Sequence, residues 1–301
     1  IFAQFTNCED DEFLGDIFAE YAKWVKGPVL KDFAFGHTMP SISLPCGKMV
    51  LLEAERTEQI SLKLDRRELF EAKIFSTKGQ DRPYRLLSPE KIEYGKKYPL
   101  VLMLHGSGGR GTDNISHMRH IAATFCEEEV RKKYSCFVVF PQCPEENRWV
   151  EQPWGPRHFV QPLEISRSLA TALELHDELI KTLPIDTNRL YVMGLSMGGY
   201  ATWDIIAREN ERFAAAIPIC GGADMRNVEK YCKIPLWVFH GSEDRVVPPE
   251  LSRSICKAIN DAGGNCRYTE YQGEEHFSWI PAMKEKELLP WLFEQELGNR
   301  E

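Results

Sequence analysis

The stretch Arg-Leu-Tyr-Val-Met-Gly-Leu-Ser-Met-Gly-Gly-Tyr at residues 189–200 decides the predicted fold. Residues 189–193 form an apolar run of strand length, and residues 200–208 have the composition of a helix. Between them, GLSMG matches the G-x-S-x-G pattern, in which a serine occupies a sharp turn between a strand and a helix. For an isolated match, a serine in an ordinary Gly-rich turn is the better interpretation. The flanking strand and helix reverse this preference and indicate a nucleophile at Ser196.

A second apolar run, residues 100–104, leads into the Gly-rich loop His-Gly-Ser-Gly-Gly-Arg-Gly at residues 105–111. Glycines allow a backbone to approach a ligand closely, and acyl transfer needs two N–H donors aimed at a developing oxyanion. We expect these donors to be the N–H groups of Met197 and Ser107, with Gly108 close by. A phosphate-binding loop is the alternative, but no Gly-Lys-Ser/Thr follows.

A third apolar run, residues 234–239, precedes His-Gly-Ser-Glu-Asp at residues 240–244. Open α/β sheets place functional groups just beyond such strand ends. We expect Asp244 to accept a hydrogen bond from a histidine and to stabilise its charged form. Glu243 is the rival carboxylate, and a turn-capping role is open for either residue.

The general base is chosen among eight histidines by its position in the chain. His276 follows both Ser196 and Asp244, which gives the chain order Ser, Asp, His. That order is typical of one class of serine hydrolases. His276 is therefore the predicted base, although an isolated loop histidine is more often simply solvated.

The segment at residues 142–161 is long and contains Trp149 and Trp154. Their rings are suited to stacking on a sugar or a phenolic ring, or they pack the loop onto the domain. Both alternatives stay open on the sequence alone. The predicted substrate contacts are Trp149, Trp154, Trp279 and Gly108.

These segments resemble the α/β-hydrolases over residues 67–298. Residues 98–114, 140–144, Trp149 and the sequence His-Phe-Ser-Trp at residues 276–279 are similar to one branch of that superfamily. The branch contains polyhydroxybutyrate depolymerases, feruloyl esterases and acetylxylan esterases, and it is often described as predicted peptidases. The resemblance implies a secreted or periplasmic serine esterase, although no signal peptide is recognisable after Ile1. It does not define the ester.

Composition limits the possible partners. The 301 residues carry 37 basic and 45 acidic side chains, a net charge of −8 that disfavours nucleic acid and anionic membranes as partners. No apolar run is long enough for a membrane-spanning helix. We expect neither a metal nor an organic cofactor. The nine cysteines contain no C-x-x-C pair, and their pairing is left open.

We expect two parts along the chain: an N-terminal extension at residues 1–66 and an α/β-hydrolase catalytic domain at residues 67–301. The extension contains a predicted helix at residues 10–26. The expected strands of the domain are residues 72–77, 82–87, 100–104, 136–141, 190–194, 215–219, 236–240 and 267–271. The expected helices are residues 118–132, 165–183, 197–208, 251–262 and 284–296. This alternation predicts a mostly parallel sheet covered on both faces, with an antiparallel edge where the first two strands lack a helix between them.

The expected reaction is hydrolysis of a carboxylic ester through an acyl-enzyme, on a small or polysaccharide-linked substrate such as a feruloyl or acetyl ester. A serine peptidase of the prolyl-oligopeptidase type is the first alternative. A non-catalytic binding protein of the same fold is the second, and it is disfavoured because all three triad residues are present. Nothing in the sequence predicts the oligomeric state.

Overall fold

The computed structural model describes residues 2–3, 50–54, 60–64, 66–119, 121–151 and 159–299. The chain divides into two compact units, Ile1–Arg66 and Arg67–Glu301. In the first unit, strands β1 (Phe2–Ala3), β2 (Val50–Ala54) and β3 (Ile60–Leu64) form an antiparallel sheet. The helix expected at residues 10–26 lies outside the described residues.

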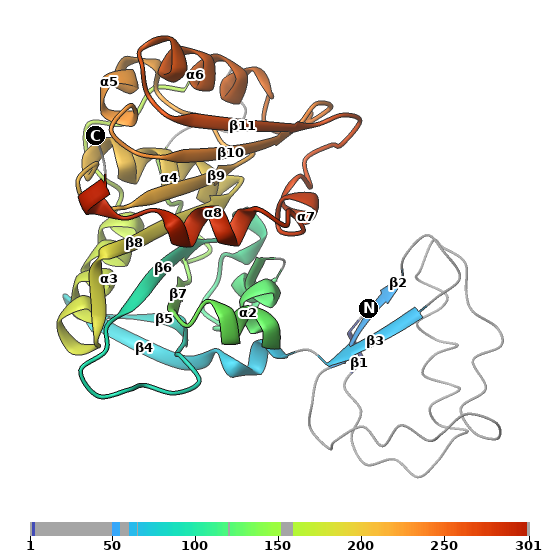
Figure 1. Ribbon diagram of the computed structural model, residues 1–301, viewed down its shortest axis with the longest axis vertical. Helices are drawn as coiled ribbons and strands as arrows, with labels where there is room; N and C mark the ends of the chain where they lie inside the picture. Colours follow the sequence, from blue (N-terminus) through green and yellow to red (C-terminus); the bar gives the residue numbers. More distant parts are fainter. Residues whose placement is uncertain are drawn as a thin grey trace. The chain divides into compact units, whose positions relative to one another are not determined.

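The second unit is built on an eight-stranded sheet in the order β11-β10-β9-β8-β6-β7-β5-β4 (Figure 1). The strands are β4 (Glu71–Thr77), β5 (Gln80–Leu87), β6 (Tyr98–Leu104), β7 (Phe137–Pro141), β8 (Ile185–Leu195), β9 (Ala215–Ile219), β10 (Leu236–Gly241) and β11 (Cys266–Tyr271). All neighbouring pairs from β7 to β11 are parallel, whereas β4, β5 and β7 pair antiparallel. The predicted fold class and antiparallel edge are confirmed.

The central strands are apolar throughout because both faces of the sheet are covered. Successive side chains of a strand point to opposite faces. In β6, Leu100, Leu102 and Leu104 belong to one buried cluster, and Val101 and Met103 belong to the other. Two separate cores therefore sandwich the sheet, which explains why this strand needs no polar alternation.

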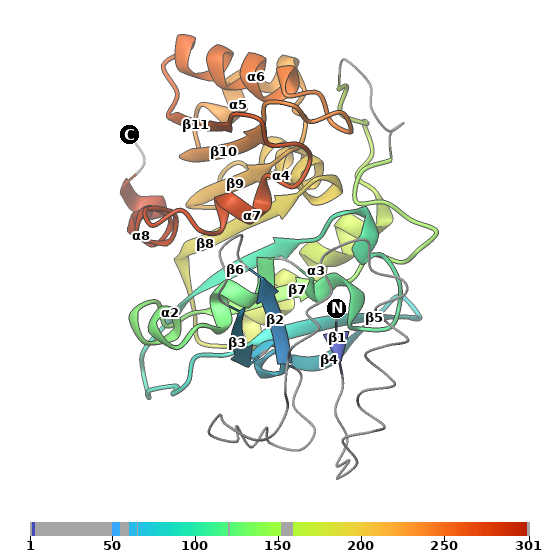
Figure 2. The same ribbon diagram turned by 90° about the vertical axis from the view of Figure 1, so that its right-hand side faces the viewer.

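Helices cover both faces of the sheet (Figures 1 and 2). One core includes residues of α3 (Arg167–Thr182), α4 (Met197–Arg208), α5 (Val228–Tyr231) and α6 (Glu250–Asp261). The other core includes residues of α7 (Trp279–Ala282) and α8 (Leu288–Glu294), and α2 (Glu128–Lys133) precedes β7. Short 3-10 helices occupy Arg66–Leu69, Ser107–Gly109, Ser116–Met118, Ile121–Cys126, Met225–Asn227 and Leu297–Asn299.

The single helix predicted at residues 118–132 is wrong. Two 3-10 helices, Ser116–Met118 and Ile121–Cys126, precede the short α2. Glu127 separates the second of them from α2 with an extended backbone at φ −64° and ψ 136°. The buried residues of this segment reach the core from short 3-10 turns, a common form of connector. Apolar spacing does not distinguish such turns from one longer helix.

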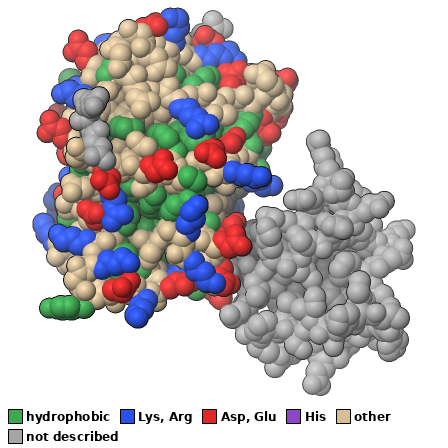
Figure 3. Space-filling view, viewed as in Figure 1, with side chains coloured by type: hydrophobic (Ala, Val, Ile, Leu, Met, Phe, Trp, Pro, Cys, Tyr) green, Lys and Arg blue, Asp and Glu red, His purple; other side chains and the backbone are tan. Residues whose placement is uncertain are grey.

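The surface carries charges of both signs. On the face drawn in Figure 3, Lys and Arg side chains alternate with Asp and Glu, and neither sign gathers into a large patch. Among the described helices, none combines the length and the apolar composition needed to cross a bilayer.

Candidate active site

The predicted site residues follow the carboxyl ends of parallel strands. Ser196 follows β8, Ser107 follows β6, and Asp244 follows β10. His276 comes five residues after β11 ends at Tyr271. β6 and β8 are neighbours, and β10 pairs with β11. Because these strands are parallel, the segments that follow them lie at the same end of the strands, their carboxyl ends.

Ser196 occupies a strained turn between β8 and α4. Its φ is 53° and its ψ is −115°, and its N–H donates to the carbonyl of Ile219 at 2.9 Å. A Cβ on Gly194 would lie 2.3 Å from the carbonyl oxygen of Gly198, and one on Gly198 would lie 1.9 Å from that of Leu104. The two glycines thus let the turn fit between the strands, and the turn presents the serine at the end of the sheet.

The structure brings Ser196, His276 and Asp244 into one chain of hydrogen bonds. His276 Nε2 lies 2.9 Å from Ser196 Oγ, and His276 Nδ1 lies 2.7 Å from Asp244 Oδ2. A carboxylate oxygen only accepts, so Nδ1 carries the proton and Nε2 is left to accept one from the serine hydroxyl. This is the arrangement that a nucleophile, its base and an orienting acid require.

The environment of Asp244 keeps it ionised. Burial alone would raise its pKa, but hydrogen bonds from His240, His276 and the N–H of Val247 hold the pKa of Asp244 well below its ordinary value. His240 is fully buried, and its Nε2 lies 3.2 Å from Asp244 Oδ2. The rival carboxylate Glu243 is exposed, and within the described part of the chain no hydrogen bond joins it to His276.

The two residues expected to supply the oxyanion donors follow neighbouring strands, Ser107 after β6 and Met197 after β8. Ser107 and Gly108 begin a 3-10 helix that lines the cleft around Ser196, and Met197 opens helix α4. No partner within the described residues accepts a hydrogen bond from the N–H of Ser107 or of Met197. The first N–H groups of a helix are available to an anion and carry a partial positive charge.

A cleft of about 230 Å³ opens above the serine. Its described lining comes from the loop after β6, from the elbow and from the segment around His276. Phe277 is 50 % exposed in this cleft, and it contacts Trp279 edge to face at 5.1 Å. Trp279 is buried, lines the same cleft and lies edge-on to His276 at 5.4 Å, so its role as a substrate contact stays a prediction.

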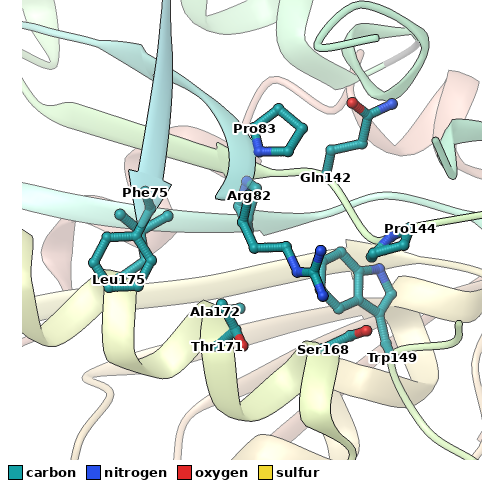
Figure 4. A pocket seen from close by; sticks show the side chains of 11 residues that line it. Phe75, Arg82, Pro83, Gln142, Pro144, Trp149, Ser168, Thr171, Ala172 and Leu175 are labelled. Carbon is teal, nitrogen blue, oxygen red and sulfur yellow. The ribbon is translucent and has the colours of Figure 1, made fainter. Parts of the chain in front are cut away.

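The stacking role expected for Trp149 does not fit its position. The ring is 1 % exposed, and its Nε1–H donates to the carbonyl of His105 at 3.0 Å. Figure 4 shows it with the Arg82 guanidinium at a small pocket under the loop, with the Gln142 amide turned away from both. Trp149 therefore packs its loop onto the domain. Trp154 lies outside the described residues.

His105 anchors the base of the Gly-rich loop as a neutral ring. Its Nδ1 donates to the carbonyl of Gly106 at 2.7 Å, and its Nε2 accepts from the N–H of Cys143 at 3.0 Å. Burial lowers the pKa of His105 to about 4, which agrees with an accepting Nε2.

Cys220 was not anticipated from the sequence as part of the site. It is buried at a φ of 40°, and its sulfur belongs to a group with Asp244 and His276 whose polar atoms all lie within 4.8 Å of one another. Burial raises the pKa of the thiol above its ordinary value, so Cys220 is a neutral neighbour of the acid. The seven described cysteines are all free thiols.

Comparison with known proteins adds independent findings. The model of the prolyl oligopeptidase family matches residues 167–236, and that of the LD-carboxypeptidase C-terminal domain matches residues 1–52. A solved thermostable esterase is 40 % identical with a TM-score of 0.70, over 77 % of this chain and 64 % of that one. Carboxylesterase SOBER1 of Arabidopsis thaliana is 23 % identical, over 58 % of this chain and 82 % of its own.

A solved ferulic acid esterase is similar with a TM-score of 0.57 at 16 % identity, over 74 % of this chain and 97 % of that one. At this identity the likeness concerns the fold. The chain spans less than two thirds of the thermostable esterase, 64 % of its length. The thermostable esterase and SOBER1 are thus both esterases to which this chain is similar.

Proposed function

We propose that this chain, whose fold is that of the α/β-hydrolases, is a serine hydrolase that cleaves carboxylic esters. The observation that carries the proposal is the hydrogen-bonded chain from Asp244 through His276 to Ser196, at 2.7 and 2.9 Å. In addition, Ser196 is held at a positive φ that only a tightly determined turn sustains.

The geometry supports a two-step reaction. His276 Nε2 takes the hydroxyl proton as Ser196 Oγ attacks the ester carbonyl, and Asp244 stabilises the resulting imidazolium. The developing oxyanion accepts hydrogen bonds from the N–H groups of Ser107 and Met197. His276 then returns the proton to the departing alcohol, and a water molecule releases the acyl group by the same route.

The proposed substrate is an ester with a short acyl chain or one aromatic or sugar ring. The cleft of about 230 Å³ is small beside typical ligand pockets of roughly 300–1,000 Å³. The exposed ring of Phe277 offers a flat apolar surface beside the base.

Kinetics on a panel of esters and amides tests the proposal. The panel holds p-nitrophenyl acetate, butyrate and dodecanoate, methyl ferulate and a peptide anilide, with Ser196→Ala as the inactive control. A deep acyl pocket would gain about 0.8 kcal/mol for each buried methylene. Because the cleft is small and cannot bury a long acyl chain, we expect kcat/KM to be higher for the acetate or the butyrate than for the dodecanoate. Preference for chains of twelve carbons would contradict the proposed substrate class.

A serine peptidase is the second candidate, because the prolyl oligopeptidase family model matches residues 167–236. Amide cleavage places a greater demand on His276, which must protonate a poor amine leaving group. Faster turnover of the peptide anilide than of the esters would favour this candidate. Turnover of no substrate at all would favour a binding protein of the same fold.

A further inference from the structure

We propose that Gln142 is a positioning residue that fixes the loop bearing the Ser107 oxyanion donor; this inference rests on the proposed function. Gln142 follows β7 directly, and its N–H donates to the carbonyl of Pro83 on β5 at 3.0 Å. The residue is 2 % exposed, although an amide side chain is mostly found at the surface.

The amide nitrogen and the amide oxygen of Gln142 both make hydrogen bonds to the loop after β6. Its Nε2 donates to the carbonyl of Gly109 at 3.1 Å and to Asp113 Oδ1 at 2.8 Å. Its Oε1 accepts from the N–H of Asn114 at 2.8 Å. One side chain thus holds two peptide groups and one carboxylate that span six residues of the loop, and Gly109 lies two residues after Ser107.

The exposed Asp113 carboxylate makes this contact directional. Burial would raise the pKa of Asp113, but hydrogen bonds from Ser116, Gln142 and the N–H of Ile115 hold its pKa well below the ordinary value. The ionised carboxylate can only accept, so it fixes which end of the Gln142 amide faces it. The opposite end is then oriented to receive the Asn114 N–H.

Neighbouring contacts tether the same loop to β5 and to the segment after β7. Arg85 Nε on β5 donates to the carbonyl of Asn114 at 2.7 Å, and the N–H of Gly111 donates to the carbonyl of Cys143 at 2.9 Å. Arg110 Nη1 donates to the carbonyl of Glu145 at 2.8 Å. Two described side chains bond the 3-10 helix that starts at Ser107: Gln142 Nε2 donates to the Gly109 carbonyl and Arg110 Nε donates to the Ser107 carbonyl, each at 3.1 Å. Of the two, Gln142 is the one that comes from outside the loop.

An oxyanion donor acts only when it points at the position of the developing charge, and losing one costs roughly 100- to 1,000-fold in kcat. A displaced loop would lose part of that effect without removing the nucleophile or the base. We therefore expect Gln142→Leu to lower kcat for p-nitrophenyl acetate roughly 10- to 100-fold, with KM within about threefold. Ser196, His276 and Asp244 remain in place in this variant.

Asn260→Leu is the matched control. The Asn260 amide also bonds two main-chain groups, donating to the Cys266 carbonyl at 2.8 Å and accepting from its N–H at 3.0 Å. Those bonds join α6 to the start of β11, at the opposite end of the strands from the site. We expect this variant to keep the kcat of the wild type even where its stability falls.

Amide hydrogen exchange separates this inference from the proposed function, because it requires no ester turnover. Gln142→Leu should accelerate exchange in residues 109–116 and leave β8 and β10 unchanged. Faster exchange throughout the sheet, unchanged exchange in the loop, or a kcat within threefold of the wild type would each overturn the inference. A wild type without esterase activity refutes the proposed function, while the exchange result still decides the role of Gln142.

Gln142→Glu keeps the inference testable if the leucine variant does not fold. Burial and the nearby Asp113 carboxylate should raise the pKa of the introduced carboxyl group. Below that pKa the neutral group still donates one hydrogen bond; above it the charge repels Asp113. We expect the ratio of the kcat of this variant to that of the wild type to fall with rising pH. Parallel profiles would count against the inference.

Discussion

Ser196 combines a strained backbone with a hydroxyl that is hydrogen-bonded to a base. Such strain persists only where the surroundings over-determine it. Three features fix this turn: helix α4, the hydrogen bond from the Ser196 N–H to Ile219, and the close packing of the main chain at Gly194 and Gly198. The residue is thus positioned before any substrate arrives.

Ser196→Ala tests the nucleophile. We expect kcat to fall by several orders of magnitude, because the members of a triad act as a unit, with little change in the free energy of unfolding. A fluorophosphonate probe should label the wild type once, at Ser196, in a digest read by mass spectrometry. Labelling at Ser107 instead would show that the wrong hydroxyl was chosen.

Asp244→Asn tests the acid. The amide can still contact His276 but stabilises neither its tautomer nor its positive charge, so kcat should fall roughly 100- to 10,000-fold. The adjacent Glu243→Gln is the matched control, since that exposed carboxylate does not reach His276. Steady-state kinetics of both variants decide the assignment, and a larger loss in the Glu243 variant would reverse it.

At the scale of elements, the start of α4, directly after β8, packs very closely against the main chain of β6. A methyl group on Gly198 would lie 1.9 Å from the Leu104 carbonyl oxygen, which belongs to a central strand and cannot yield easily. We expect Gly198→Ala to cost on the order of 3 kcal/mol in the free energy of unfolding, measured in urea. Gly298→Ala is the control, because a methyl group on that residue would have no neighbouring atom within 4 Å; similar losses in both would argue against a tight junction.

The segment around α7 carries the exposed aromatic surface of the cleft. Phe277→Ala should raise KM for methyl ferulate about two- to tenfold, from the loss of a ring contact, and change KM for p-nitrophenyl acetate less. Ile280→Ala on α7 is a control of similar exposure, 49 % against 50 %, and it does not line the described cleft. Equal effects of Phe277→Ala on both esters would remove the ring-stacking role.

The strands could be predicted because long apolar runs such as residues 100–104 are buried on both faces. The turn that carries Ser196 could be predicted because glycines in the sequence indicate a tight local turn. The Gly-rich loop at residues 105–111 could be located, but residues 118–132 were wrongly predicted as one helix, since 3-10 turns share their apolar spacing with a helix. The role of Gln142 depends on β7 lying between β5 and β6, and strand order cannot be read from residue types.

At the scale of the whole molecule, three of the buried histidines in the described residues, His105, His117 and His176, have pKa values well below the ordinary value. Burial is the main cause that lowers the pKa of His105 to about 4 and those of His117 and His176 to about 3. His117 lines the cleft, whereas His176 lies on α3 and contacts Arg212 at 3.2 Å. None of these rings takes a proton readily while the chain is folded.

Folding stability should therefore fall on acidification. The unfolded chain binds these protons near pH 6.5, whereas the folded chain resists them until about pH 3–4, and each pKa unit corresponds to about 1.4 kcal/mol. We expect urea-unfolding free energies to decrease steadily from pH 7 to pH 5. The decrease should be smaller in His176→Gln, whose amide oxygen can still accept from Arg212. Constant stability over this range would contradict buried neutral histidines.

The pairing of β6 with β8 has a consequence for how such a site can diversify. Leu104 and Gly194 are partners in that ladder, and Ser107 and Met197 each follow their partner by three residues. The two segments that carry the proposed donors thus start from adjacent strand ends, which lie about 4.8 Å apart through their main-chain pairing. Side-chain substitutions within β6 and β8 leave this main-chain spacing unchanged. New substrate preferences can therefore arise by exchange of the surrounding loops, while the reaction itself is passed on unchanged.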